Sequence, residues 1–300
     1  MKQLAVYLFF GFISHAALAQ HSFFKPSDTL NSKRRNAVVI SKATLGGLTL
    51  LALNQFWYTD YERSKFHTVN DNSDWLQLDK LGHTFSAYQL GRLGAQSLSW
   101  AGISKKGQLI YGGTLGFTFL TAVEVLDGFS EEWGFSWGDF TANAAGSGLY
   151  IGQELLWEEQ RIVMKYSFHR TKYASQRPDK LGDGFFEEFL KDYNGQTYWL
   201  SANMHAFFKN SKIPKWLNLA VGYGGEGLLS GEASLMINNA LIKQNRQRQF
   251  YLSLDVDLTR IKTNSMFLKS VFSVFNTIKI PFPTVEFNDK NGIKLHAIYF

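Results

Sequence analysis

The sequence of 300 residues contains no cysteine. Disulfide bridges, thiolate metal sites and a lipid-modified cysteine are therefore excluded for these residues. Two familiar catalytic signatures are also missing: the His-Glu-x-x-His pair of zinc proteases, and the glycine-rich loop with a following lysine that binds nucleotide phosphates. No metal-ligand spacing links His67, His169, His205 and His296. None of these motifs assigns a reaction to the chain.

The first residues have the pattern of a secretory signal, predicted over residues 1–19. Lys2 supplies the positive start, and Leu4–Ile13 supplies the apolar centre. The small residues of 17–19 form the cleavage pattern before Gln20. We therefore expect an exported protein, with an uncleaved anchoring signal as the alternative.

Charge is unevenly distributed along the remaining chain. Residues 20–160 carry 11 basic and 14 acidic residues, whereas residues 161–300 carry 19 basic and 11 acidic residues. This split favours two segments with different surfaces. In an exported protein, a basic half suits the surface of envelope lipids or glycans better than nucleic acid. A lysine-rich, solvated surface without a partner is the alternative.

The first half of the chain has the pattern of a helical bundle. After a polar lead-in at 20–36, four helices are predicted at 38–57, 79–100 and 109–126 and from Ser136 onward. The segments 38–57 and 109–126 are long enough to cross a membrane or to fill a core. Small residues recur every four positions in the third and fourth helices. We expect tight helix packing, with close contacts at Gly116, Ala142 and Gly146.

After Trp157 the apolar period changes from about four residues to two, which indicates strands. About five antiparallel strands are predicted, near 162–168, 198–204, 217–223, 251–258 and 293–300. Two short helices are predicted at 184–193 and 266–278. The expected fold class is α+β, with a helical domain at 20–160 and a β-rich basic domain at 161–300. Five strands are too few for a membrane barrel, so a half-buried sheet packed on the helices is expected.

Polar residues concentrate at the predicted ends of the helices. Asp79 and His83 are four residues apart, as are Asp139 and Asn143, so each pair shares a helix face. If the helices are antiparallel, their ends meet at one rim of the bundle. We predict that His83, Glu124, Asp139 and Asn143 converge there. The full candidate site is Asp79, Lys80, His83, Glu124, Asp127, Ser136, Asp139 and Asn143.

This set of residues suits two kinds of chemistry. An aspartate can orient a histidine for general-base catalysis or for metal ligation, and carboxylates with one histidine suit a hard or borderline divalent ion. The sequence leaves the metal and any other cofactor open. Each residue also has a purely structural alternative. Asp79 can cap its helix and Asp139 can favour the helix dipole, while His83 and Asn143 can form hydrogen bonds within the core.

The same residues carry a resemblance. Asp79-Lys-Leu-Gly-His83, Glu124 and the Ser136-x-x-Asp139-x-x-x-Asn143 pattern resemble the YfiM-like domain of unknown function and, more distantly, VanZ-like membrane proteins. The resemblance covers roughly residues 30–160, and residues 177–199 resemble the extension of longer YfiM-like members. It implies a periplasmic or outer-membrane protein, often a lipoprotein. It implies no catalytic residues.

Two functions are consistent with these patterns. The first is an exported envelope factor without enzymatic activity. Its polar rim binds a ligand or only stabilises the packing of the helices, and its β-rich part docks to a membrane or partner. The second is a membrane-associated hydrolase that acts on a lipid or cell-wall substrate through His83, Asp79, Glu124 and Asp139. Lys33-Arg-Arg35 and Lys105-Lys106 would violate the positive-inside rule if the helices spanned the inner membrane from outside. With the final Phe300, which resembles the ending of outer-membrane β proteins, this favours the outer membrane or periplasm.

Overall fold

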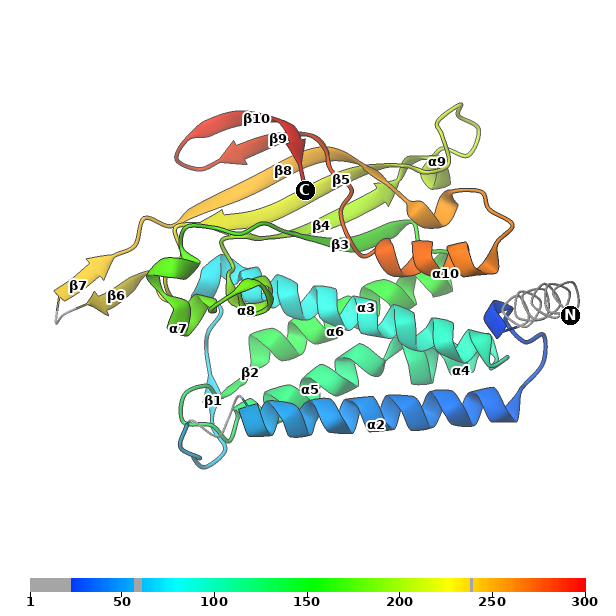
Figure 1. The fold of residues 1–300 in the computed structure, drawn as a ribbon, viewed down its shortest axis with the longest axis horizontal. Helices are drawn as coiled ribbons and strands as arrows, with labels where there is room; N and C mark the ends of the chain where they lie inside the picture. The colour runs from blue at the N-terminus through cyan, green and yellow to red at the C-terminus, as the bar shows by residue number, and fades with distance from the viewer. Residues whose placement is uncertain (1–22, 57–60, 238–239) are drawn as a thin grey trace, which may run out of the picture.

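The computed structural model describes residues 23–56, 61–237 and 240–300, so the predicted signal segment lies outside the described residues. A layer of helices and a β-sheet lie face to face (Figure 1). The helices are α2 (Ser32–Phe56), α3 (Leu78–Trp100), α4 (Lys105–Gln108), α5 (Leu115–Asp127), α6 (Trp137–Leu156), α7 (Pro178–Leu181), α8 (Phe185–Lys191), α9 (Met204–Phe207) and α10 (Met266–Phe275). The strands are β1 (Thr68–Val69), β2 (Phe135–Ser136), β3 (Ile162–Phe168), β4 (Gln196–Asn203), β5 (Leu217–Glu226), β6 (Ser234–Ile237), β7 (Ala240–Lys243), β8 (Gln247–Val256), β9 (Phe282–Asn288) and β10 (Gly292–Tyr299). The α+β class is confirmed.

Helix α3 is the centre of the fold, because it packs on α5 and α6 on one side and on the sheet on the other. The four predicted helices are present. Helix α2 begins at Ser32, earlier than expected, and thus includes part of the predicted lead-in. The third helix is not continuous, since a π-helical turn at Leu109–Gly113 precedes α5. The π turn follows from close packing: a Cβ on Gly112 would lie 2.5 Å from the Ala95 Cα of α3.

Small residues stand where the helices approach most closely, as predicted. A Cβ added to Gly116 would lie 2.2 Å from the Ala87 carbonyl oxygen of α3. A Cβ added to Gly146 would lie 2.1 Å from the Thr84 carbonyl oxygen of the same helix. Neither position has room for a side chain, and Ala142 is buried beside them. The spacing of small residues in α5 and α6 therefore sets their distance from α3.

Two helical segments are long and apolar enough to cross a membrane, namely Ser32–Gln55 and Lys105–Asp127. Only 6% of the apolar window in the first segment is buried, against 28% in the second. Helix α2 lies along the outside of the helical layer (Figure 1). It is tied to α3 by Lys42, whose Nζ donates to the Gly94 carbonyl oxygen at 2.9 Å. Its apolar side chains face outward for most of its length.

The main sheet has six antiparallel strands in the order β10-β9-β8-β5-β4-β3. All five predicted strands are in it, and both predicted short helices are present as α8 and α10. The prediction missed β9 and the hairpin of β6 and β7. Two-residue strands β1 and β2 pair in parallel beside the helical layer. The proposed domain boundary at residue 160 stays a prediction.

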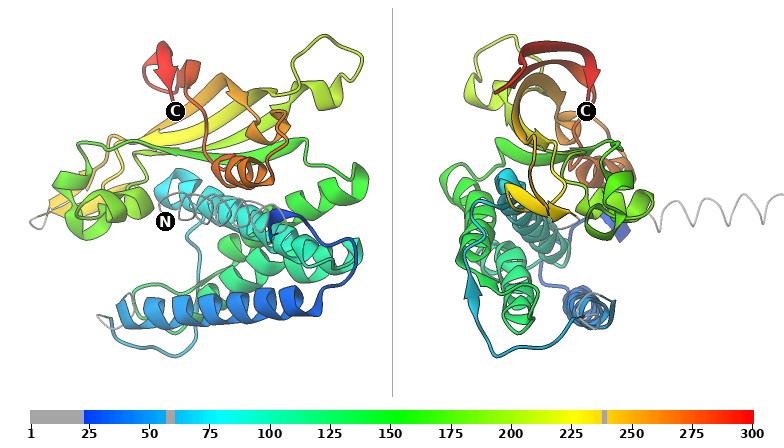
Figure 2. Two further views of the ribbon diagram at one scale, coloured as in Figure 1. Left: turned by 45° about the vertical axis from the view of Figure 1, so that its right-hand side comes forward. Right: turned by 90° about the vertical axis from the view of Figure 1, so that its left-hand side faces the viewer.

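The expected packing of the sheet on the helices holds for β3, β4 and part of β5. There, Tyr166 and Tyr198 stack against Phe85 of α3. The remaining strands curl away from the helices (Figure 2). Side chains on the same face of these strands are exposed, for example Phe250 at 50% and Leu252 at 39%. The sheet therefore leaves much of its apolar face uncovered.

Candidate functional site

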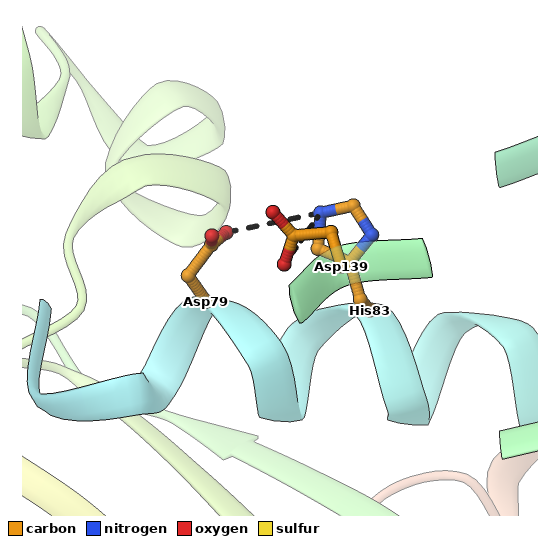
Figure 3. Close-up of side chains that lie close together, drawn as sticks. All are labelled: Asp79, His83 and Asp139. Atoms are coloured by element: carbon orange, nitrogen blue, oxygen red, sulfur yellow. Dashed lines mark ion pairs between the residues drawn. The ribbon is translucent and has the colours of Figure 1, made fainter. Parts of the chain in front are cut away.

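The start of α3, the end of α5 and the β2–α6 junction meet at one end of the helical layer. Asp79 and His83 stand one turn apart on α3, and Asp139 reaches them from the first turn of α6 (Figure 3). Glu124 comes from the last turn of α5. The predicted convergence is confirmed, since the Nδ1 of His83 also lies 3.0 Å from the Oδ1 of Asn143 on α6.

The other ring nitrogen of His83 faces three carboxylates. Its Nε2 lies 3.9 Å from Asp79 Oδ1, 3.8 Å from Asp139 Oδ1 and 3.7 Å from Glu124 Oε1. All three separations exceed the length of a hydrogen bond. Glu124 and Asp139 are buried, at 2% and 4% exposure. The imidazole Nε2 therefore points between the carboxylates of Asp79, Glu124 and Asp139, here called the acidic cage, and forms a hydrogen bond with none of them.

The second oxygen of each carboxylate has a donor of its own. Lys80 Nζ donates to Asp79 Oδ2 at 3.1 Å and to Asp139 Oδ2 at 2.9 Å. The backbone N–H of Ser136 donates to Glu124 Oε2 at 3.2 Å. These donors hold the carboxylates in fixed orientations, each with one oxygen turned toward His83. Metal sites commonly orient their ligands in this way.

Ser136 has a structural task at the start of α6. Its Oγ accepts from the Asp139 N–H at 3.1 Å, which caps the helix, and donates to Asp71 Oδ1 at 2.6 Å. Gly134-Phe-Ser136-Trp-Gly138 also fits the Gly-x-Ser-x-Gly pattern of nucleophilic serines. That role requires a strained backbone and a histidine base. Ser136 is extended, with φ −97° and ψ 119°, and its hydroxyl is bonded to Asp71, so the geometry supports a cap.

Burial and charge shift the acidities at this site. Burial raises the pKa of Glu124 to about 8, and it raises the pKa of Asp139 to about 6. Burial works to lower the pKa of His83, but the surrounding carboxylates outweigh it and hold the pKa above its ordinary value. The same competition raises the pKa of Lys80, because the carboxylates around it favour its charge. The raised pKa of Glu124 favours its neutral form near neutral pH, while Lys80 and His83 face the carboxylates as cationic or proton-binding groups.

Several of these side chains could hold a metal ion. Asp79, His83 and Asp139 each offer a ligand atom, and these atoms lie within 4.8 Å of one another. Two buried atoms remain without a hydrogen bond, namely Asp139 Oδ1 and Asn143 Nδ2. Asp139 Oδ1 instead forms an ion pair with Lys80, whose Nζ lies 2.9 Å away. Buried polar atoms seldom stay unpaired in native proteins.

Two residues of the site escaped the prediction. Asp71 lies 2.7 Å from Lys80 Nζ, and Tyr193 donates to Asp79 Oδ1 at 2.9 Å. Asp71 belongs to a polar loop, where an acid is unremarkable. Tyr193 lies within residues 177–199, which resemble the extension of longer YfiM-like members. That resemblance was the only feature of the sequence that pointed to Tyr193. Asp127 was also predicted, and its negative charge helps to raise the pKa of Glu124.

The structural alternatives fare differently. Asp79 does not cap α3, because the helix begins at Leu78 and its cap position is Gln77. Asp139 does occupy the first turn of α6, where a negative charge is favoured. Asn143 does form the cross-helix hydrogen bond with His83. Whether the site also binds a ligand stays a prediction.

Residues 69–152 match the family model of a predicted periplasmic lipoprotein, DUF2279. This is a domain of unknown function in the periplasm, and it includes every residue of the predicted site. No curated protein and no solved structure matches the chain. The match supports an exported envelope protein. It does not extend to the YfiM-like and VanZ-like resemblance or to the hydrolase interpretation, which stay predictions.

Proposed function

We propose that this protein is a membrane-associated factor of the periplasm that binds one divalent cation at the centre formed by His83, Asp79, Glu124 and Asp139. One observation carries the proposal: three carboxylate oxygens surround the His83 Nε2 at nearly equal distances of 3.7–3.9 Å, and none is hydrogen-bonded to it. The donors described above hold the opposite oxygen of each carboxylate, while Asp79 Oδ1 also accepts from Tyr193 and Asp139 Oδ1 also lies 2.9 Å from Lys80 Nζ.

The separations between these atoms suit a bound ion. For bonds of about 2.1 Å, a tetrahedral ion separates its ligand atoms by about 3.4 Å. The three separations between His83 Nε2 and the carboxylate oxygens exceed this value by a few tenths of an ångström. The ligand atoms of Asp79, His83 and Asp139 lie within 4.8 Å of one another, so side-chain rotations must bring the oxygens closer together around an ion. One imidazole nitrogen with carboxylate oxygens suits Zn²⁺ or Mn²⁺. With Nδ1–H donating to Asn143 Oδ1, the Nε2 lone pair faces the cage.

An ion pair alone explains the geometry less well. A protonated histidine normally approaches a carboxylate to about 2.7–2.9 Å. For comparison, His296 Nε2 lies 2.7 Å from Glu286 Oε2 in the sheet. His83 stays about 1 Å farther from each of three acids, although all of them carry or can carry negative charge. A cation between the four groups accounts for this spacing.

Metal analysis of the full-length protein tests the proposal. After loading with Zn²⁺ or Mn²⁺ and gel filtration, wild type should retain one ion per chain and gain melting temperature, because an ion bound only to the folded state stabilises it. Glu124→Gln should weaken binding while keeping the acceptor for Ser136, and His83→Ala should abolish it. His296→Ala is the matched control and should bind as wild type does. If wild-type protein retains neither Zn²⁺ nor Mn²⁺ after loading, and its melting curve does not change, these four side chains have a structural role only.

Membrane association rests on the outer surface of α2. Val39, Leu45 and Leu51 are 54%, 65% and 66% exposed, although helices in soluble proteins bury one face. Cell fractionation tests this part. We expect recovery with the outer membrane, and recovery with the inner membrane or with the soluble periplasmic proteins would contradict it.

A further inference from the structure

The inner, concave face of the curled sheet carries polar side chains beside an aromatic cluster of Trp199, Tyr251 and Tyr299. Lys165 and Asp255 form an ion pair of 2.8 Å there, and both side chains are fully buried. Ser201 Oγ donates to the same Asp255 at 2.6 Å. Across the curl, the hydroxyl of Tyr299 on β10 lies 3.2 Å from Thr197 Oγ1 on β4. The sheet therefore encloses charged and hydroxyl groups together with these aromatic rings.

The opposite, convex face is apolar, and its rows run across several strands. The strand register aligns Leu200, Val221, Leu252, Val285 and Leu295 into one row from β4 to β10. A second row aligns Tyr223, Phe250, Phe287 and Ile293. Leu252 is 39% exposed and Leu295, on the edge strand, is 77% exposed. Helix α3 contacts β3, β4 and β5, so the face is continuous with the core.

The loop between β4 and β5 adds charge to this apolar surface. Residues 207–216 read Phe-Phe-Lys-Asn-Ser-Lys-Ile-Pro-Lys-Trp and contain no acid. Phe208 and Trp216 are 57% and 39% exposed. Lys209, Lys212 and Lys215 are exposed and form no ion pair within the described part of the chain. Aromatic residues beside lysines are typical of the interface between an anionic membrane and water.

We infer that the convex face of β5, β8, β9 and β10 contacts the acyl region of an anionic bilayer, with the loop 207–216 at its headgroups. The inference rests on the membrane association proposed above and names the surface that performs it. Charge complementarity identifies the occupant, because an acid-free loop with three lysines attracts anionic headgroups. Contact is shallow. The free edge of β10 has unpaired backbone groups, which cannot enter the hydrocarbon core without a partner.

The absence of native cysteine permits a direct test, since a single introduced cysteine carries the only label. An environment-sensitive NBD label is attached at Leu252→Cys, at Leu295→Cys as a second variant on the exposed edge, and at Ser175→Cys, an exposed polar control. Vesicles of phosphatidylcholine with phosphatidylglycerol are then added. Labels at 252 and 295 should shift to the blue and be quenched by lipids with spin-labelled chains. The label at 175 should stay in water.

A charge-removing variant tests the loop. Lys209→Gln, Lys212→Gln and Lys215→Gln together should lower the affinity for vesicles with phosphatidylglycerol on the order of 100-fold, since each lysine contributes roughly a fivefold step. Affinity for pure phosphatidylcholine should stay unchanged. An equal loss on both vesicles would contradict the assigned role of the lysines.

The remaining outcomes separate this inference from the proposed membrane association. If the protein floats with vesicles while labels at 252 and 295 stay in water, the sheet inference is wrong and membrane association stands. A blue shift at Leu48→Cys on α2 alone would assign the contact to that helix. A blue shift at 252 without lipid that grows with protein concentration would show that a second copy covers the face. No flotation at all would overturn both.

Discussion

The contact between α3 and α6 predicts opposite effects for two alanine substitutions in one helix. In Gly146→Ala, the new methyl group would lie 2.1 Å from the Thr84 carbonyl oxygen and 2.9 Å from the Ala87 Cβ. The nearest atom belongs to the backbone of α3, so no side chain can rotate out of the way. The two helices must separate or the new residue must distort α6.

The magnitude follows from two opposing terms. Overpacking costs about 1–3 kcal/mol, and a backbone contact this short places it near the upper end. Replacing glycine by alanine inside a helix returns about 1 kcal/mol. Gly146→Ala should therefore lower the free energy of unfolding by about 1–2 kcal/mol. A chain of this size loses about 2–4 °C of melting temperature per kcal/mol, so the expected fall is roughly 2–8 °C.

Gly148→Ala is the matched control, because it lies two residues away in the same helix. No atom lies within 4 Å of its added Cβ. It keeps only the helix-propensity gain and should raise the melting temperature by about 2–4 °C. Thermal unfolding followed by far-UV circular dichroism measures both variants. A rise for Gly146→Ala, or the same sign for both, would refute the close approach of α6 to α3.

Three further predictions concern caps and buried charges. Ser136→Ala removes the cap of α6 and should cost about 1 kcal/mol in urea unfolding, and Ser136→Thr, which keeps the hydroxyl that donates to Asp71, should recover part of it. Burial lowers the pKa of Lys279 to about 8 from its ordinary 10.5, so the unfolded chain binds more protons between these pH values. Wild-type stability should therefore rise with pH across this window, and Lys279→Met should remove that rise. Lys165→Met leaves Asp255 buried without its partner and should cost about 3–5 kcal/mol, whereas adding Asp255→Leu should recover most of the loss.

The helices were predictable because local patterns determine them. The apolar period located four helices, and the spacing of Gly116 and Gly146 identified their contacts before any contact was visible. Strand β9 was missed because Pro281 and Pro283 were interpreted as the end of a helix only. Pro283 stands just before the first residue of β9 that pairs with β8, Thr284, so no hydrogen bond to β8 requires its missing N–H.

Most residues of the candidate site could be named from the sequence, but two of its residues and the orientations of its carboxylates could not. His83, Asp139 and Asn143 stand at helix ends, and antiparallel packing brings such ends together. Asp71 and Tyr193 join them through a loop and through the segment before β4, which no periodicity connects to α3. The orientation of each carboxylate depends on donors from other elements, such as the Ser136 backbone N–H. Those donors can be assigned only after the chain has folded.

The polarity of the sheet shows the limit of period-two patterns. Alternation places Leu252 and Leu254 on one face of β8 and Asp255 on the other, but it does not say which face turns to water. The usual assumption turns the apolar face inward. Here Lys165, on a strand ninety residues earlier in the sequence, supplies the buried partner that lets Asp255 turn inward instead. A sheet that satisfies its polar face internally has no need of water on that face. Its apolar face then gains stability only from an apolar surrounding, and this is the physical basis of the membrane contact proposed for the convex surface of β5, β8, β9 and β10.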